Sequence, residues 1–312
     1  MAIDGSDSYR MGCGDFSFVE RESEEAAWLI GRGIAEDMPA GDATTQPLFG
    51  QQRQPLWLEA DFVAREAGVL SGLPVVEVLF REHAADVQLE ILRSDGDSLA
   101  AGHPFLRVRA PAASLLPLER LALNFLQRLS GIATVTARWI EEIRSTRASL
   151  LDTRKTTPGW RYLEKYAVRC GGGTNHRMNL SDGILLKDNH IAILSGAGRG
   201  DLATWVSRLR ESGETPLLEV EVDTRDQFLI ALDLEVDAIL LDNFAVDDLR
   251  WAVEERDRRS ATGPLLEASG GIKLPTARAV AMTGVDRISV GALTHSAVSL
   301  DIAIDVRGVF EQ

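Results

Sequence analysis

The chain is 312 residues long and carries 33 lysine and arginine residues against 47 aspartate and glutamate residues, a net charge of −14. Its 45% hydrophobic and 26% charged residues are typical of a globular protein and exclude a disordered or fibrous chain. The acidic balance excludes a protein that coats nucleic acid or an anionic membrane, because both tasks need a basic surface. Any anion-binding site is therefore local.

The sequence places no targeting or redox feature in the chain. Cys13 and Cys170 lie far apart, which excludes a disulfide framework and a thiolate zinc site. No run is apolar enough for a secretory signal or a membrane span. We therefore expect a cytoplasmic protein whose cysteines are reduced and serve in packing.

The first half of the chain predicts a small α+β domain. Residues 1–16 are rich in glycine, serine and aspartate and are expected to be frayed, whereas 21–33 have helical spacing. Short strand-like runs separated by glycine and aspartate turns follow between residues 56 and 108. A helical pattern from Leu118 to Arg144, just after Pro117, then leads into a second domain.

The second half alternates apolar runs with amphipathic helical stretches. The apolar runs are SLLDTRK, GILLKDN, PLLEVEVD, DAILLDN, PLLEASGG and DRISVGA. The stretches between them, each long enough for a crossover helix, are WRYLEKYAVR, DLATWVSRLRE, RDQFLIALD, VDDLRWAVEER and LPTARAVAMTG. Continuous apolar strands followed by helices predict a parallel sheet with a covered outer face.

Polar residues and glycines recur where these strands end. They are Asp152, Arg154, Lys155, Lys187, Asp188, Glu221, Asp223, Asp242, Ser269, Gly270 and Gly291. The carboxyl ends of parallel strands face one mouth in an α/β barrel, and one edge in a doubly wound sheet. Either fold gathers these residues into one site. The alternative is that they merely terminate strands, but a random polar cap need not recur at six strands.

A locally basic segment indicates an anionic ligand. Residues 152–190 include seven basic and four acidic side chains, which gives this segment a net charge of +3. Arg154, Lys155 and Lys187 directly follow apolar strands and suit a ligand with several carboxylates or phosphates. The other basic residues of one helical stretch, Arg161, Lys165 and Arg169, are expected on a solvated helix face. The three glycines of GGGTNHR allow close backbone approach to a ligand or a neighbouring element.

Two further features suit a phosphate substrate. Glu221 and Asp242 end neighbouring strands, and paired carboxylates are what a magnesium–phosphate complex requires; a structural ion pair is the alternative. The glycines at 270–271 and Gly291 follow the last two strands, where backbone amides can cradle a phosphate or simply form a tight turn. Dinucleotide, Walker, zinc-protease and serine-hydrolase signatures are all missing, and GAGRG at 196–200 has the wrong spacing for the first.

Long motifs in order make the chain resemble the quinolinate phosphoribosyltransferases. The motifs are ERLALNFLQRLSGIAT (119–134), LDTRKTTPGWRYLEKYAV (151–168), CGGGTNHRMNLSDGILLKDNHI (170–191), EVEVDT (219–224), LLDNF (240–244), ASGGI (268–272) and VGALTHS (290–296), with GDATT (41–45) and GVLSG (68–72) in the first domain. Trp160 stands where this family pattern leads us to expect an aliphatic residue.

This resemblance implies an α/β fold with two domains. Residues 1–130 would form an α+β open-faced sandwich, and residues 131–295 an incomplete, seven-stranded α/β barrel. The tail, residues 296–312, would return to the first domain. The family's sites are shared across a homodimer, which can assemble into a hexamer, and partners other than small-molecule substrates are not expected: no nucleic acid and no membrane.

The implied reaction joins quinolinate to 5-phosphoribosyl-1-pyrophosphate, with Mg²⁺, to give nicotinate mononucleotide, pyrophosphate and CO₂ in NAD synthesis. Lys155, Glu221 and Asp242 would be catalytic, the two carboxylates holding the metal indirectly through pyrophosphate or water. The implied substrate-binding residues are these three with Arg120 from the neighbouring subunit, Thr153, Arg154, His176, Arg177, Lys187, Ser269, Gly270, Gly291 and His295.

Three alternatives remain at this point. A non-catalytic subunit could bind phosphoribosyl pyrophosphate without turnover. A phosphate-sugar aldolase would need Lys155 or Lys187 as a Schiff-base amine. Within the superfamily, a relative associated with molybdenum-transport operons is the main competitor, although KDNH at 187–190 and GGGTNHR favour the quinolinate enzyme.

Overall fold

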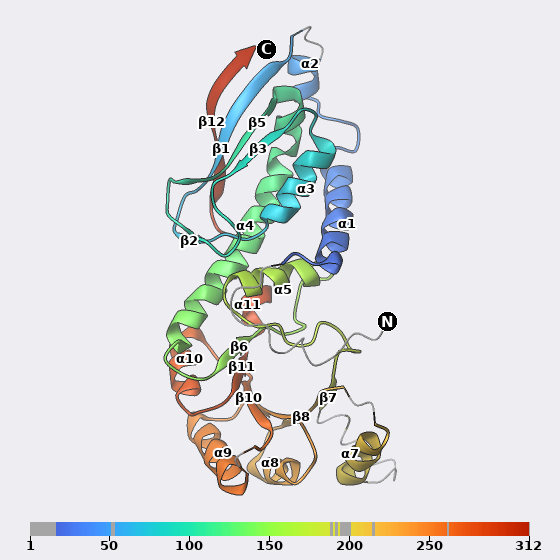
Figure 1. Ribbon diagram of the computed structural model, residues 1–312, viewed down its shortest axis with the longest axis vertical. Coiled ribbons are helices and arrows are strands. Elements are labelled where there is room, and N and C mark those ends of the chain that lie inside the picture. Colours follow the sequence, from blue (N-terminus) through green and yellow to red (C-terminus); the bar gives the residue numbers. More distant parts are fainter. Residues whose placement is uncertain are drawn as a thin grey trace. The chain divides into compact units, whose positions relative to one another are not determined.

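The computed structural model describes residues 17–50, 54–187, 190, 193, 201–213, 216–260 and 262–311 (Figure 1). The chain divides into two compact units. One, the antiparallel-sheet unit, holds the described residues among 17–137, 155–172 and 292–311. The other, the parallel-sheet unit, holds residues 138–154 and 173–291. Cys13, Asp188 and residues 196–200 lie outside the described residues.

The antiparallel-sheet unit is built on a four-stranded sheet whose order is β12-β1-β5-β3. Its strands are β1 (Leu56–Ala64), β3 (Gln88–Ile91), β5 (Pro104–Pro111) and β12 (Ile302–Glu311). β1 pairs antiparallel with β5 on one side and with β12 on the other, so the last strand of the chain lies beside the first (Figure 1). β2 (Gly68–Val69) and β4 (Ser98–Leu99) form a separate two-stranded sheet.

Helices accompany this sheet and bury its apolar face. They are α1 (Glu20–Asp37), α2 (Thr45–Phe49), α3 (Leu73–His83), the part of α4 (Ala112–Ile143) up to residue 137, α5 (Arg161–Cys170) and α11 (Ala292–His295). Phe62 of β1 is fully buried between Phe80 of α3 and Phe105 of β5, with ring centroids 6.0 and 6.3 Å away. Edge-to-face and tilted rings of this kind hold helix and sheet together.

Helix α4 begins six residues before the expected start at Leu118. Pro117 lies inside its second turn, where a proline leaves one carbonyl of the first turn without its N–H donor. The apolar spacing nevertheless continues on both sides of it, since Leu115, Leu118 and Ala122 are all buried. Tertiary packing of that face therefore outweighs the local penalty of the proline.

A close approach between α4 and α5 explains one of the three consecutive glycines. A Cβ atom on Gly171 would lie 2.4 Å from the carbonyl oxygen of Ala133 in α4. Only glycine fits at that separation. Cys170, beside it, is buried against Ala133 and Tyr166, and burial raises the pKa of its thiol to about 12. The thiol is therefore a protonated packing group.

The parallel-sheet unit contains the six apolar runs, each as a strand. In sheet order they are β6 (Ser149–Leu151), β11 (Arg287–Ser289), β10 (Leu265–Ser269), β9 (Ala238–Asp242), β8 (Leu218–Val222) and β7 (Ile184–Leu186). All neighbours pair in parallel. A parallel bridge between Leu151 and Thr174 adds residue 174 beside β6. The predicted mixed α/β fold, with a parallel sheet and a separate antiparallel one, is confirmed.

The helices of this unit are α7 (Leu202–Glu211), α8 (Arg225–Leu232), α9 (Val246–Arg259) and α10 (Leu274–Ala281) (Figure 1). The expected helix at 160–169 also exists, as α5, but it belongs to the antiparallel-sheet unit rather than to the parallel sheet. Among the described residues, no helix combines the length and the apolar character that crossing a membrane requires.

Candidate active site

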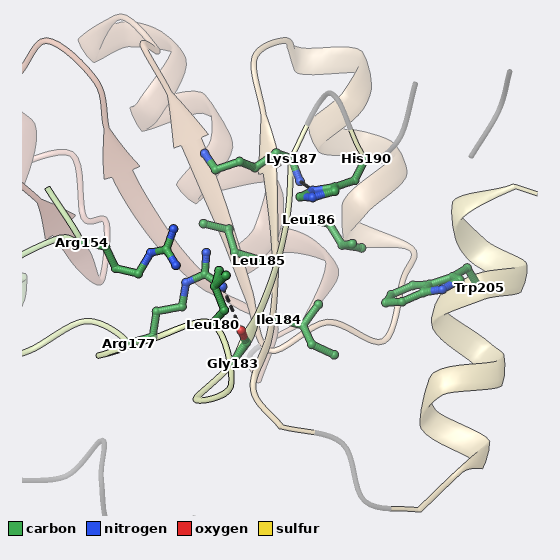
Figure 2. A pocket seen from close by; sticks show the side chains of 10 residues that line it. All are labelled: Arg154, Arg177, Leu180, Gly183, Ile184, Leu185, Leu186, Lys187, His190 and Trp205. Carbon is green, nitrogen blue, oxygen red and sulfur yellow. Dashed lines mark hydrogen bonds between the residues drawn. The ribbon is translucent and has the colours of Figure 1, made fainter. Parts of the chain in front are cut away.

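A pocket of about 430 Å³ lies at the carboxyl end of β7 in the parallel-sheet unit. Ten residues line it: Arg154, Arg177, Leu180, Gly183, Ile184, Leu185, Leu186, Lys187, His190 and Trp205 (Figure 2). Three of the predicted site residues, Arg154, Arg177 and Lys187, therefore share one pocket. The remaining wall is mostly apolar, and a mixture of apolar walls with a few charged groups is typical of sites for small ligands.

The Arg177 side chain is anchored to the strand that floors the pocket. Its Nη1 donates to the carbonyl oxygen of Gly183, 2.9 Å away, immediately before β7 (Figure 2). Arg154 follows β6 and reaches the same pocket. Two guanidinium groups facing one cavity form a binding site for carboxylate or phosphate, because each presents a planar fork of N–H donors.

Lys187 and Glu221 form an ion pair at the ends of neighbouring strands. Lys187 Nζ lies 2.5 Å from Glu221 Oε2, and the side chains are 45% and 13% exposed. β7 and β8 pair in parallel, so residues that follow or end them lie at the same edge of the sheet. The pair brings together the predicted cation and carboxylate from the two motifs KDNH and EVEVDT.

Asp242 and Ser269 are paired residues at the ends of β9 and β10. The tight turn after β10 explains Gly270: its φ is +85°, and a Cβ there would lie 2.4 Å from Asn243 Oδ1 and 2.7 Å from Asp242 Oδ1. Asn243 itself has a φ of +55° and donates to Asp242 Oδ2. The structure therefore holds the predicted carboxylate and the predicted phosphate loop in direct contact, and Gly291 follows the next strand, β11.

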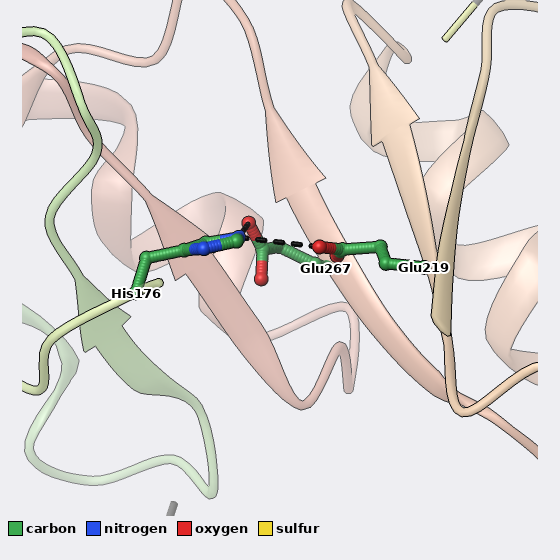
Figure 3. Close-up of side chains that lie close together, drawn as sticks. All are labelled: His176, Glu219 and Glu267. Atoms are coloured by element: carbon green, nitrogen blue, oxygen red, sulfur yellow. Dashed lines mark ion pairs between the residues drawn. The ribbon is translucent and has the colours of Figure 1, made fainter. Parts of the chain in front are cut away.

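His176 lies in a buried cluster with two glutamates that were not predicted. Its Nε2 is 3.2 Å from Glu219 Oε2 and 3.4 Å from Glu267 Oε1 (Figure 3). His176 is 8% exposed, Glu219 1% and Glu267 not at all. Within the part of the chain that the structure describes, Glu219 Oε1 and both Glu267 oxygens have no hydrogen-bond partner.

The three groups shift one another's protonation. Burial opposes a charge on the ring, but the two carboxyl groups outweigh burial and raise the pKa of His176. Burial, reinforced by the charge of Glu267, raises the pKa of Glu219, whereas His176 outweighs burial at Glu267 and lowers its pKa. The two carboxyl pKa values shift in opposite directions, so the cluster resists carrying two negative charges in the interior.

The backbone around His176 is tied to the end of β6. Asp152, fully buried, accepts hydrogen bonds from the His176 N–H at 2.9 Å and from Asn175 Nδ2 at 2.6 Å. Arg177 N–H in turn donates to His176 Nδ1 at 2.7 Å. Thr153, partly buried, comes next in the chain after Asp152, directly before Arg154.

Three predicted site residues belong to the other unit. Arg120 is exposed on α4, His295 is exposed at the end of α11, and Lys155 is exposed with its carbonyl oxygen bonded by the Thr294 hydroxyl at 2.8 Å. Their participation in a common site stays a prediction.

The expected solvated face at residues 161–169 is wrong. Lys165 is fully buried, and Arg169, with a side chain only 16% exposed, pairs with the buried Glu22 of α1 at 2.9 Å. Arg161 donates to Thr156 Oγ1 at 3.1 Å. This helix packs against other helices of its unit, so its basic residues are buried or paired instead of solvated.

The fold and the pocket define an α/β protein in which two arginines and a lysine line a cavity beside β7 of a parallel sheet. Models of the quinolinate phosphoribosyl transferase family match nearly the whole chain, the N-terminal domain at residues 42–130 and the C-terminal domain at residues 132–305. The chain belongs to this family.

Relatives and solved structures agree with the family models. The chain is 41% identical to a probable nicotinate-nucleotide pyrophosphorylase (carboxylating) of Bacillus subtilis, over 89% of this chain and 92% of that protein. It is 42% identical to the nicotinate-nucleotide pyrophosphorylase (carboxylating) of Mycobacterium leprae, over 91% and 98%. The nicotinate-nucleotide pyrophosphorylase structure from Francisella tularensis superposes with a TM-score of 0.82 at 35% identity, covering 91% and 96%.

Proposed function

We propose that the chain is a decarboxylating quinolinate phosphoribosyltransferase of NAD synthesis. It transfers the phosphoribosyl group of 5-phosphoribosyl-1-pyrophosphate to quinolinate, giving nicotinate mononucleotide, pyrophosphate and CO₂. The observation that carries this proposal is the pocket shared by Arg154, Arg177 and Lys187, since a substrate with two carboxylates needs several cations in one partly apolar cavity. Family membership supports the same reaction.

Arg154, Arg177 and Lys187 bind the quinolinate carboxylates and the pyrophosphate, together with Lys155. Thr153 and His176 line the same site, and Arg120 of a neighbouring subunit completes it. Ser269, Gly270, Gly291 and His295 bind the 5-phosphate. Support for the phosphate loop comes from the positive φ of Gly270, which turns backbone amides away from the strand.

Glu221 and Asp242 fit a magnesium–pyrophosphate complex. Both are carboxylates at the ends of adjacent strands, and oxygen ligands are what Mg²⁺ prefers. Glu221 Oε2 is engaged by Lys187, so contact with the metal through water or pyrophosphate suits this donor set. When bound, Mg²⁺ neutralises charge on the leaving pyrophosphate.

The reaction needs orientation and charge rather than a covalent nucleophile. As the bond to pyrophosphate lengthens, positive charge builds on the ribose ring, and Glu221 and Asp242 stabilise it electrostatically. The pyridine nitrogen then bonds to the anomeric carbon and becomes cationic. The electron pair of the adjacent carbon–carboxylate bond flows into that cationic ring, CO₂ leaves, and a proton takes its place. Arg154 and Arg177 hold the substrate in line for the attack.

The larger assembly follows the same family pattern. The barrel is an incomplete one of seven strands, which the extra bridge at Thr174 beside the six-stranded sheet supports. The first domain covers residues 1–130, the barrel 131–295, and the tail 296–312 returns to the first domain, as the pairing of β12 with β1 supports. The enzyme works in the cytoplasm as a homodimer with shared sites, or as a hexamer built from three such dimers.

The first test is the reaction itself. Purified protein is incubated with phosphoribosyl pyrophosphate and quinolinate, with and without Mg²⁺, and nicotinate serves as the control substrate. We expect nicotinate mononucleotide and CO₂ from quinolinate only, dependent on Mg²⁺. Binding of phosphoribosyl pyrophosphate without product from either pyridine would contradict the enzyme and indicate a binding subunit.

The shared site has its own test. Arg120→Ala and Arg177→Ala subunits are inactive alone if each removes one side of the same site. Mixed heterodimers of the two would then contain one intact site and recover part of the activity. An unmixed preparation of each variant at the same concentration is the control, and failure of every mixture to recover activity would place the whole site within one chain.

A further inference from the structure

The pocket arginines are held by a buried hydrogen-bonded frame in which His176 is the one member also expected to line the site. Arg154 and Arg177 come from two separate segments, the end of β6 and residues 174–177. A ligand with two neighbouring carboxylates can pair with both guanidinium groups only if the distance between these groups matches the distance between its carboxylates. Whatever joins the two segments therefore fixes the spacing of the charges that the ligand meets.

Asp152 joins the segments. It lies two residues before Arg154, and its carboxylate receives the backbone N–H of His176 and the side-chain amide of Asn175. Its Oδ1 and Oδ2 are both used, one for each donor. A fully buried carboxylate with two donors from a single neighbouring segment acts as a clamp, because moving that segment would leave a buried charge unsatisfied.

The Glu219–His176–Glu267 cluster holds the other end of the same segment. The His176 ring is fixed on one side by the two carboxyl groups and on the other by the Arg177 N–H at Nδ1. Arg177 is thus held through its backbone by His176 and through its guanidinium by Gly183. Glu219 and Glu267 also lie two residues before Glu221 and Ser269 on their strands, so alternation points each toward the same face as a predicted site residue.

We propose that Asp152, Asn175, Glu219 and Glu267 are positioning residues that set the spacing of Arg154 and Arg177 and thereby select a pyridine with two adjacent carboxylates. The inference rests on the proposed function, since quinolinate is the ligand whose carboxylates the arginines would bind. It predicts a selective loss of affinity for that substrate. It does not predict a general loss of activity.

The test compares Asp152→Asn with a matched control. Asp286 is also a largely buried aspartate of this unit, with a side chain 18% exposed, and it accepts the Leu266 N–H at 2.8 Å and pairs with Arg256. It precedes β11, at the amino-terminal edge of the sheet, away from the strand ends that form the pocket. Asp286→Asn therefore removes a comparable buried carboxylate without touching the frame.

We expect Asp152→Asn to raise the KM for quinolinate by about 10- to 100-fold, by analogy with the loss of groups that orient the ligands of a metal ion. The KM for phosphoribosyl pyrophosphate and kcat at saturating quinolinate should change less than about twofold. An interaction that is equally strong in the ground state and in the transition state affects KM and leaves kcat unchanged. Asp286→Asn should leave both KM values unchanged. Asn175→Ala, which keeps the Asp152 charge, should give a smaller rise in the same constant.

The outcomes distinguish a failure of the proposed function from a failure of the positioning role. A wild-type protein that makes no product from quinolinate contradicts the proposed function itself. A wild-type protein that turns over, while Asp152→Asn and Asn175→Ala keep the wild-type KM for quinolinate, overturns the positioning role alone. Equal rises in both KM values for Asp152→Asn and Asp286→Asn would also overturn it, since they would mark a general structural defect. If Asp152→Asn does not fold, Asn175→Ala carries the test.

Discussion

Buried glutamates in the two units are satisfied very differently. In the antiparallel-sheet unit, Glu164 is fully buried and receives Arg128 Nη2 at 2.6 Å, Arg128 Nε at 3.2 Å, the Thr157 hydroxyl at 2.9 Å and the Thr157 N–H at 3.1 Å. In the parallel-sheet unit, Glu219 and Glu267 share one imidazole, and three of their oxygens have no hydrogen bond of good geometry among the described residues; the Ser289 hydroxyl and the charge of Arg287 add to the stabilisation of Glu267.

The difference separates buried charges that stabilise the fold from buried charges that position residues of the pocket. A buried charge with several donors depends on its partner, because removing that partner leaves an uncompensated charge in the interior and destabilises the fold. An under-bonded cluster contributes less to stability, and here its His176 accepts the N–H of Arg177, which lines the pocket. Strain and unsatisfied groups are commonly concentrated next to functional sites. The predictions below test this distinction.

The largest effect is expected for Arg128→Ala. It strips Glu164 of its cation and also removes donors from the carbonyl oxygens of Thr294 and Ala297. Breaking a buried pair in this way costs about 3–5 kcal/mol. Urea denaturation should show the loss, with Arg81→Ala as the control: that side chain is 67% exposed and pairs with Glu77 on a helix surface, where the cost is below about 1 kcal/mol. Equal losses of stability in Arg128→Ala and Arg81→Ala would contradict the distinction between a buried ion pair and a surface ion pair.

A smaller effect is expected for Gly270→Ala. Both Gly270 and Gly213 have positive φ, +85° and +87°, so alanine at either costs roughly 1–2 kcal/mol of backbone strain. At Gly213 an added Cβ meets nothing within 4 Å, whereas at Gly270 it meets Asn243 and Asp242. Gly270→Ala should therefore also raise the KM for phosphoribosyl pyrophosphate, and Gly213→Ala should not. A normal KM in Gly270→Ala would remove this turn from the phosphate site.

The sequence predicts the strands and their functional ends well, because both signals are local. Apolar runs of four to six residues mark buried strands, and the polar residue after each run marks its carboxyl end. Arg154 and Lys187 share a pocket for that reason, and Arg177 joins them from the GGGTNHR segment. The chemistry of the motifs then follows from residue type.

The burial of Lys165 and the grouping of residues 155–172 with the antiparallel sheet could not be predicted in the same way. A charged residue at a helical position is normally solvated, and only the packing of α5 against α1 makes this one buried. Glu219 and Glu267 did leave a signal. Each is an acidic residue inside a mostly apolar strand, two residues before a predicted site residue, and that alternation places it on the same face.

Measuring stability as a function of pH should test whether the buried Asp61 is stabilised by its ion pairs. Burial alone would raise the pKa of Asp61, but Arg107 at 2.7 Å and Arg307 at 2.9 Å outweigh burial and hold its pKa below the ordinary 3.8. A lowered pKa contributes stability that is present above the unfolded value near 3.8 and is lost as pH falls through the folded value.

The expected contribution of Asp61 is about 1 kcal/mol, since Arg307 is half exposed and its charge is screened. The stability difference between wild type and Asp61→Asn should therefore be present near neutral pH and shrink in acid. Asp305→Asn is the control, because Asp305 of β12 forms an exposed pair with Arg65. The stability of this variant should differ little from that of wild type at any pH. A wild-type advantage over Asp61→Asn that grows in acid would contradict the pairing.

The smallest effect on stability is expected where the largest effect on selectivity arises. Glu267→Gln removes a charge that His176 stabilises, so it should lower the free energy of unfolding, but only by about 1 kcal/mol, because the amide oxygen can still accept from His176. Glu219→Gln should change it even less, because the raised pKa of Glu219 already favours its neutral form. Quinolinate binding, measured calorimetrically on the same samples, should weaken in Glu267→Gln because His176 then loses its charged partner. A loss of 3 kcal/mol or more, about the cost of breaking a buried pair, with unchanged binding would make this cluster an architectural one, equivalent to Arg128 and Glu164.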